Sequence, residues 1–236
     1  MYVATRGVCF FDDSRESNEL NRCTAEDTAM PRTTTRPARS ARSSSSRSAS
    51  SRAASKTDKA AFILYPLDEF YEAAGLPLPR HSAIDGAKML EPYRSLLVHN
   101  GDMTPALENH YRDSIHIERL QAHNTARGYS REVVLRLNGN ERAVEYGAIK
   151  INLKFFGKKA SEEIVNGNKP LGAIMREYKI VHGSKPKAFL QVYTDGVISE
   201  ALGVAENTRV FGRRNTLVMP NGEPLAEIVE ILAPAL

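Results

Sequence analysis

Residues 129–153 read YSREVVLRLNGNERAVEYGAIKINL, and they decide the fold. Residues 129–137 are rich in Val and Leu, which favour strands, and residues 143–153 alternate in part between apolar and polar side chains. The Asn138-Gly139 pair between them is a strong signal for a tight turn. The sequence therefore predicts an antiparallel hairpin with a sheet built around it.

The segments on either side carry similar signals. Further strands are expected over residues 114–123, 187–193, 209–219 and 225–232. Helices are expected over residues 67–74, 83–97, 155–165, 171–178 and 197–202. Thr104 followed by Pro105 predicts another helix, with Thr104 as its N-cap. Because the strands arrive as hairpins and the helices are grouped between them, the predicted class is α+β, an antiparallel sheet flanked by helices.

Residues 31–56 have a different composition from the rest of the chain. They hold nine Ser, six Arg and one Lys, with no acid and no large apolar side chain. Such a segment cannot bury enough surface to offset its ordering entropy, so residues 1–59 are predicted to be a disordered extension and residues 60–236 the domain. The chain carries +4 and this segment +7, which leaves −3 elsewhere. A nucleic-acid partner is therefore not required by the charge.

Composition also excludes several kinds of chemistry in the predicted domain. Cys9 and Cys23, the two cysteines of the chain, both precede it, so neither a disulfide nor a thiolate nucleophile is expected there. No apolar run approaches the roughly 20 residues that span a bilayer, which indicates a cytoplasmic protein. The six histidines show no metal-binding spacing, and no phosphate-binding loop is found, so no metal or other cofactor is expected.

Two charged residues stand among apolar neighbours on their strands. Arg131 shares a strand face with Val133 and Leu135, and Glu230 lies on the apolar face of the last strand. One interpretation is that Arg131 and Glu230 pair with each other in the core. The other interpretation is that Arg131 binds a carboxylate of a ligand, and that Glu230 binds a ligand hydroxyl or exchanges a proton with the ligand. Glu145 and Glu227 have similar surroundings, so periodicity does not single out Glu230.

Several short strings, taken in order, resemble the chorismate pyruvate-lyase family. The strings are DMT at 102–104, YSREVVL at 129–135, KPLG at 169–172, FGRRNTL at 211–217 and EPLAEIVEIL at 223–232. HNGDMT at 99–104 and EYGAI at 145–149 are similar to a divergent branch of that family. The resemblance extends over nearly all of the chain after Leu96, and it implies a chorismate lyase-like fold.

The resemblance also implies an activity and a set of site residues. The activity is elimination of pyruvate from chorismate to give 4-hydroxybenzoate, without a cofactor. Arg131 would hold the ring carboxylate, Glu230 would contact the ring hydroxyl, and the backbone amides of Met103 and Leu171 would close on the ligand. The predicted helix start near Met103 independently favours an anion or a carboxylate there.

Chorismate has a second carboxylate, which needs a cation of its own. Lys150, Arg213 and Arg214 are candidates because they lie close to the motifs. A different class of protein competes with the enzyme: the same fold resembles the effector-sensing domain of GntR-type regulators, which bind small molecules without transforming them. Those regulators carry an N-terminal winged helix where this chain has its Ser/Arg segment. A third alternative is a family member that binds aromatic acids without turnover.

Overall fold

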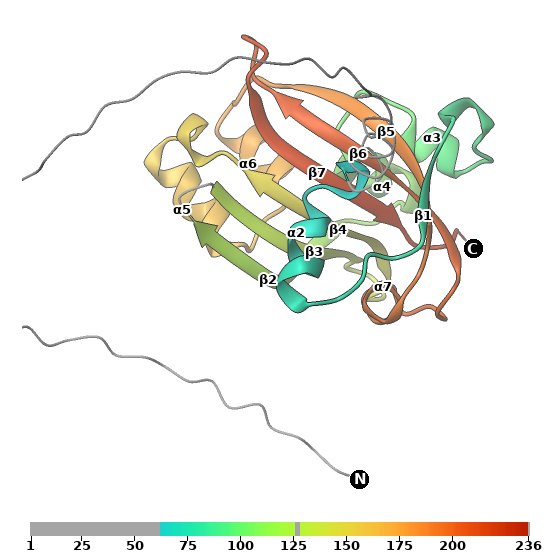
Figure 1. Cartoon of the computed structure of the whole chain (residues 1–236). Coiled ribbons are helices and arrows are strands. Elements are labelled where there is room, and N and C mark those ends of the chain that lie inside the picture. The colour runs from blue at the N-terminus through green and yellow to red at the C-terminus, as the bar shows by residue number, and fades with distance from the viewer. Residues whose placement is uncertain (1–61, 126–127, 236) are drawn as a thin grey trace, which may run out of the picture. The chain divides into compact units, whose positions relative to one another are not determined.

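The computed structural model describes residues 62–125 and 128–235, and these residues form a strongly twisted antiparallel sheet with helices on both faces (Figure 1). Within the described residues the sheet has seven strands in the order β1-β5-β6-β7-β4-β3-β2, and every neighbouring pair is antiparallel. The predicted α+β class, an antiparallel sheet flanked by helices, is confirmed. The predicted extension over residues 1–59 and the predicted domain start at Ala60 lie outside the described residues.

The strands and helices have the following bounds. The strands are β1 His81–Ile84, β2 Ile115–Thr125, β3 Gly128–Leu137, β4 Ala143–Ile151, β5 Gly183–Tyr193, β6 Arg209–Val218 and β7 Pro224–Leu232. The α-helices are α2 Leu67–Ala74, α3 Tyr93–Leu97, α4 Met103–Tyr111, α5 Lys158–Asn166, α6 Leu171–Glu177 and α7 Gly196–Leu202. Three short 3-10 helices complete the described elements: η1 Phe62–Leu64, η2 Gly86–Lys88 and η3 Leu153–Phe155.

The hairpin that the sequence predicts from residues 129–153 is present as β3 and β4, but its turn is longer than two residues. The connection runs over residues 138–142, and Glu141 takes a left-handed conformation with φ 59°. The Gly139 amide donates to Asp113 Oδ2 at 2.9 Å, and the Asn138 amide donates to the Ser114 carbonyl. The turn is thus shaped by its contacts with the segment that leads into β2, which local sequence does not reveal.

Two local predictions are wrong. The helix expected over residues 83–97 is replaced by β1, η2 and the short α3, because β1 pairs with β5 and takes its backbone into the sheet. The helix expected to start after Thr104 begins at Met103, with Asp102 in the N-cap position. Pro105 therefore falls in the first turn, where its missing N–H has no intrahelical acceptor and is tolerated.

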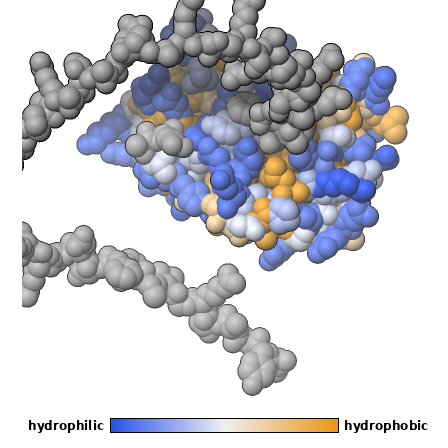
Figure 2. Space-filling view, in the orientation of Figure 1, coloured by the Kyte–Doolittle hydropathy of each residue, from blue (hydrophilic) through white to orange (hydrophobic). Residues whose placement is uncertain are grey.

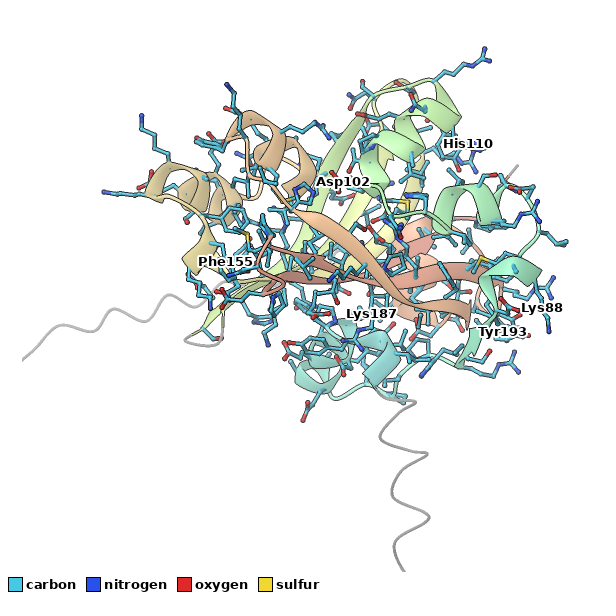
Figure 3. The ribbon with its side chains drawn as sticks, turned by 90° about the horizontal axis from the view of Figure 1, so that it is seen from above. Lys88, Asp102, His110, Phe155, Lys187 and Tyr193 are labelled. Atoms are coloured by element: carbon cyan, nitrogen blue, oxygen red, sulfur yellow. The ribbon has the colours of Figure 1, made fainter. Side chains whose placement is uncertain are left out.

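The two faces of the sheet are covered by different helices. α2 and α7 pack on the face of Val134, Tyr146 and Val229, while α3 to α6 pack on the face of Ile149 and Leu232. Seen along the sheet in Figure 3, α4, α5 and α6 lie on one side and α2 on the other. Most of the face drawn in Figure 2 is hydrophilic outside the grey atoms. In residues 62–125 and 128–235, no helix has the length and apolar content to cross a membrane.

Gly147 lies where two of the central strands, β4 and β7, come close together. On the face covered by α3 to α6, one cross-strand row holds Val133, Gly147, Glu230 and Arg213 in that order. A Cβ at Gly147 would stand 2.3 Å from the Val229 carbonyl oxygen, which belongs to the backbone and cannot swing away. A glycine inside a strand often marks such a close approach of another backbone.

We predict that Gly147→Ala lowers the free energy of unfolding by about 1–3 kcal/mol, the usual effect of forcing an extra methyl group into packed structure. Urea unfolding of the purified chain measures the difference. Gly157→Ala is the matched control, because nothing lies within 4 Å of a Cβ built at Gly157. Equal stability of the Gly147 and Gly157 variants would contradict the assignment of this close approach.

Candidate functional site

A cavity lies between the central strands and the first residues of α4 and α6. The centre of a water molecule can occupy about 80 Å³ of it, where a single water needs roughly 10–15 Å³. It can therefore hold several waters or a small ring compound. Its floor is the sheet and its lining is mostly apolar, with a few charged groups. Those charged groups are Asp102, Arg131, Glu145, Arg213 and Glu230.

Arg131 brings into this cavity a positive charge that pairs with no carboxylate of the described residues. Its side chain is 1% exposed, and it donates to the carbonyls of Lys169 at 3.1 Å and Ile164 at 3.5 Å. Its Nε has no hydrogen-bond partner, and no carboxylate of the described residues lies within 4 Å of the guanidinium. Burial lowers the pKa of Arg131, although an arginine keeps its proton in proteins. An anion entering the cavity would satisfy this charge.

Arg213 is buried on the same face of the sheet, but its charge is compensated. Its Nε donates to Glu230 Oε2, and its Nη2 lies 3.5 Å from Glu230 Oε1. The remaining donors reach the carbonyls of Leu97, His99 and Gly101 at 3.0–3.4 Å. The guanidinium thus fixes Glu230 and also holds the loop that leads into α4.

Glu145 contributes a second carboxyl-bearing side chain on this face of the sheet, after Glu230. It is 5% exposed, and its Oε2 has no hydrogen-bond partner among the described residues. Desolvation raises the pKa of Glu145 well above its usual range, the nearby Glu230 carboxylate raises it further, and Arg213 offsets only part of this. The raised pKa favours the protonated form of Glu145, and a protonated carboxyl group can donate a hydrogen bond.

The roof of the cavity is formed where two helices begin. Met103 is the first residue of α4 and Leu171 the first residue of α6, and both line the cavity. Asp102 does not cap α4 with its side chain; its Oδ1 instead lies 3.1 Å from His182 Nε2. Because His182 Nδ1 lies 3.0 Å from the Ile180 carbonyl, the segment before β5 is tied to the start of α4. Figure 3 labels Asp102 at this position.

The four site residues suggested by the resemblance come together in the structure. Arg131, Glu230, Met103 and Leu171 all line this one cavity. Arg131 and Glu230 do not pair with each other, because the partner of Glu230 is Arg213. The roles in ligand binding and catalysis that the resemblance implies for the four residues stay predictions.

The candidate cations for a second carboxylate are placed differently. Lys150 and Arg214 line a separate cavity on the other face of the sheet, where they contact Glu69 and Glu227. They cannot reach a ligand beside Arg131, so those two suggestions are wrong. Arg213 does line the ligand-sized cavity, but Glu230 neutralises its charge.

Sequence patterns missed part of this site. Glu145 could not be distinguished from Glu227 by periodicity, yet only Glu145 faces the cavity. The contact between Asp102 and His182 joins residues 80 positions apart and leaves no local signal. The glycine of EYGAI is the one available signal, because a glycine inside a strand marks close packing of the backbone.

The charges of the cavity define what it can bind. Arg213 pairs with Glu230 and Asp102 contacts His182, so Arg131 is the guanidinium of the described lining that has no carboxylate partner and can attract a negative group. The cavity also offers an acceptor, Glu230, and a donor, Glu145, for a polar group away from Arg131. The fold and the site together define an α+β domain with a cavity of small-molecule size into which one guanidinium without a carboxylate partner projects.

Comparisons with known proteins add information about the fold alone. No protein-family model and no curated protein matches this sequence. Solved structures with a similar fold include the ligand-binding domain of a putative GntR-family transcriptional regulator from Bordetella bronchiseptica, with 12% identity, a TM-score of 0.39, and 50% of this chain and 85% of that chain covered.

Two further structures give the same picture. The effector domain of PhnF from Mycobacterium smegmatis has 13% identity and a TM-score of 0.45, with 56% of this chain and 88% of that chain covered. A putative regulator from Escherichia coli CFT073 has 12% identity and a TM-score of 0.42, with 51% and 96% covered. Likenesses this weak carry no argument about function, so the resemblance to the chorismate pyruvate-lyases remains a prediction.

Glu145 generates a prediction about the pH dependence of stability. Its pKa in the unfolded chain is near 4.5 and is raised in the folded chain. Between these two values the folded state holds a proton that the unfolded state has lost, so stability falls as the pH rises, by up to about 1.4 kcal/mol per pH unit. We predict that Glu145→Gln, which cannot titrate, removes this part of the slope.

Urea unfolding of both proteins from about pH 5 to about pH 8 measures the two slopes. The other ionisable groups are common to the two proteins, among them Asp102, Arg213 and Glu230 in the same cavity. The difference between the slopes therefore reports on one carboxyl group. Parallel curves would show that Glu145 titrates normally in the folded chain.

Proposed function

We propose that the cavity binds a small aromatic acid, with the ligand carboxylate on Arg131 and a ligand hydroxyl near Glu230. One observation carries the proposal: a guanidinium that is 1% exposed faces a cavity without a carboxylate partner among the described residues. Burying such a charge is costly unless an anion meets it. A planar carboxylate fits the fork of a guanidinium and can form two parallel hydrogen bonds with it.

The ring of the ligand would lie over the apolar floor between the two ends. Arg131 is on β3 and Glu230 on β7, with β4 between them. Two strand spacings and an offset of two residues along the strands separate their backbones by roughly 12 Å, a gap that the two side chains and one ring can bridge. Gly147 leaves the floor flat at this point, since it stands between Val133 and Glu230 and has no side chain. This arrangement supports a ligand that carries polar groups at opposite ends of a ring.

Within this ligand class, we further propose that the chain is a chorismate pyruvate-lyase. The support is that the four residues named by the motif resemblance line a single cavity. Loss of pyruvate breaks the bond between the ring and the enolpyruvyl oxygen, moves one proton to the enolpyruvyl group, and leaves an aromatic ring. Aromatisation drives the reaction, so the protein has to orient the substrate, exclude water and assist that proton transfer.

A non-catalytic sensing domain for an aromatic acid is the second candidate, and a specific observation favours it. Chorismate carries two carboxylates, whereas of the two cations that line the cavity among the described residues only Arg131 lacks a carboxylate partner. A single carboxylate, as in 4-hydroxybenzoate, matches this charge without a further cation. Both candidates use the same pocket, and they differ in whether chorismate is turned over.

We predict that Arg131→Ala weakens the binding of 4-hydroxybenzoate by about 2–5 kcal/mol, the usual loss when one partner of a buried charge pair is removed. Isothermal titration calorimetry of the full chain measures the affinity. Arg136→Ala is the matched control, because Arg136 lies on the same strand but pairs with Glu118 at the surface. Equal affinity of the Arg131 variant and the wild type would remove Arg131 from the site.

We predict that the full chain releases pyruvate from chorismate without added metal. Pyruvate is followed by coupling to lactate dehydrogenase, and 4-hydroxybenzoate by its ultraviolet absorbance. Turnover that is lost in both Arg131→Ala and Glu230→Gln, but kept in Arg136→Ala, would support the lyase. Tight binding of 4-hydroxybenzoate with no turnover of chorismate at any pH tested would replace the lyase by the sensing domain.

A further inference from the structure

We infer that Glu145 is a specificity-determining hydrogen-bond donor, which together with Glu230 selects a ligand hydroxyl at the end of the ring opposite the carboxylate. The inference rests on the proposed binding of an aromatic acid and deepens it by assigning the far end of the ligand. Glu230 would accept a hydrogen bond from the ligand hydroxyl, and Glu145 would donate a hydrogen bond to the hydroxyl oxygen.

The position of Glu145 on the sheet supports this role. Arg131 pairs with Ile149 across β3 and β4, so Glu145 is four residues further along β4. That separation is roughly 14 Å along the strand, which places Glu145 at the far end of the cavity from Arg131. Glu230 is opposite Gly147 in the neighbouring strand, so Glu145 and Glu230 are diagonal neighbours on one face. Both residues line the cavity.

The hydrogen bonding of Glu145 also points to a missing partner. Its Oε2 is buried and has no hydrogen-bond partner among the described residues. The buried carboxylate of Glu132, on the opposite face of the sheet, contrasts with it, since the Tyr146 hydroxyl and the Gln121 amide donate to it. A buried polar atom without a partner is uncommon in folded proteins, and a ligand atom is one way to satisfy it. The cavity is where such an atom would sit.

Chemistry then defines the ligand group. Glu230 is held by Arg213 and accepts hydrogen bonds, whereas a protonated Glu145 donates one. A hydroxyl both donates and accepts, so it satisfies the two residues at once. An aromatic amine donates well but accepts poorly, and an unsubstituted ring does neither. The site should therefore discriminate a hydroxybenzoate from an aminobenzoate of nearly the same size.

The experiment compares two probes of the full chain, 4-hydroxybenzoate and 4-aminobenzoate, by isothermal titration calorimetry at neutral pH. Wild type is expected to bind the hydroxy acid about tenfold more tightly, the typical effect of one hydrogen bond to a buried group. Glu145→Gln is expected to keep most of this ratio, because its amide still donates. Glu145→Leu, which removes the donor at similar volume, is expected to bring the ratio close to one.

Unfolding curves of each variant show whether it is folded, and Glu145→Met, which also lacks a donor, replaces the Leu variant where that variant is unstable. A ratio that falls only when the donor is lost supports the inference. A donor-free variant that is folded, binds both acids and keeps the wild-type ratio overturns the inference and leaves the proposed binding site intact. Failure of wild type to bind either acid overturns the proposed site, and the role of Glu145 with it.

Discussion

The central constraint on the structure is the charge of two guanidinium groups that are buried on the same face of one sheet. Arg213 and Arg131 are 0% and 1% exposed, and each would be expensive to bury alone. Arg213 is compensated internally by Glu230 and by carbonyls of the loop before α4. Arg131 receives two carbonyls and no carboxylate of the described residues. The charge of Arg213 is therefore neutralised within the core. The charge of Arg131 is not, and an anionic ligand can neutralise it.

This asymmetry explains why the architecture matters for the site. The order β3-β4-β7-β6 puts Arg131 and Arg213 three strands apart, with Gly147 of β4 leaving room between them. Two of the helices on this face, α4 and α6, begin at the cavity, so their first residues form its roof. The contact of Asp102 with His182 fixes the start of α4 to the segment before β5. The site is thus assembled from segments spread along the chain, each placed by pairing in the sheet.

Much of the fold could be predicted from the sequence, because hydrophobic period and turn residues act locally. The hairpin over residues 129–153, the helix ended by Gly75 and the final hairpin all follow such local rules. Strand parity placed Arg131 and Glu230 on apolar faces, but it could not decide whether they paired. That choice depends on the register of β6 against β7, which brings Arg213 opposite Glu230. β1 was missed for the same reason, since its pairing partner β5 is about 100 residues away.

The protonation of Glu145 bears on the choice between the two proposed functions. An ionised Glu145 would place a second negative charge beside Glu230, with Arg213 as the shared cation. A neutral Glu145 leaves the far end of the cavity nearly uncharged, which suits a hydroxyl and also tolerates a carboxylate as a hydrogen-bond acceptor. The second carboxylate of chorismate could then be held by a donor rather than by a cation. Because Arg131 is the one cation without a carboxylate partner in the described lining of the cavity, strong binding of a dianion is less favoured, whereas turnover is affected less. Weak ground-state binding of a substrate whose transition state is held better is what raises a catalytic rate.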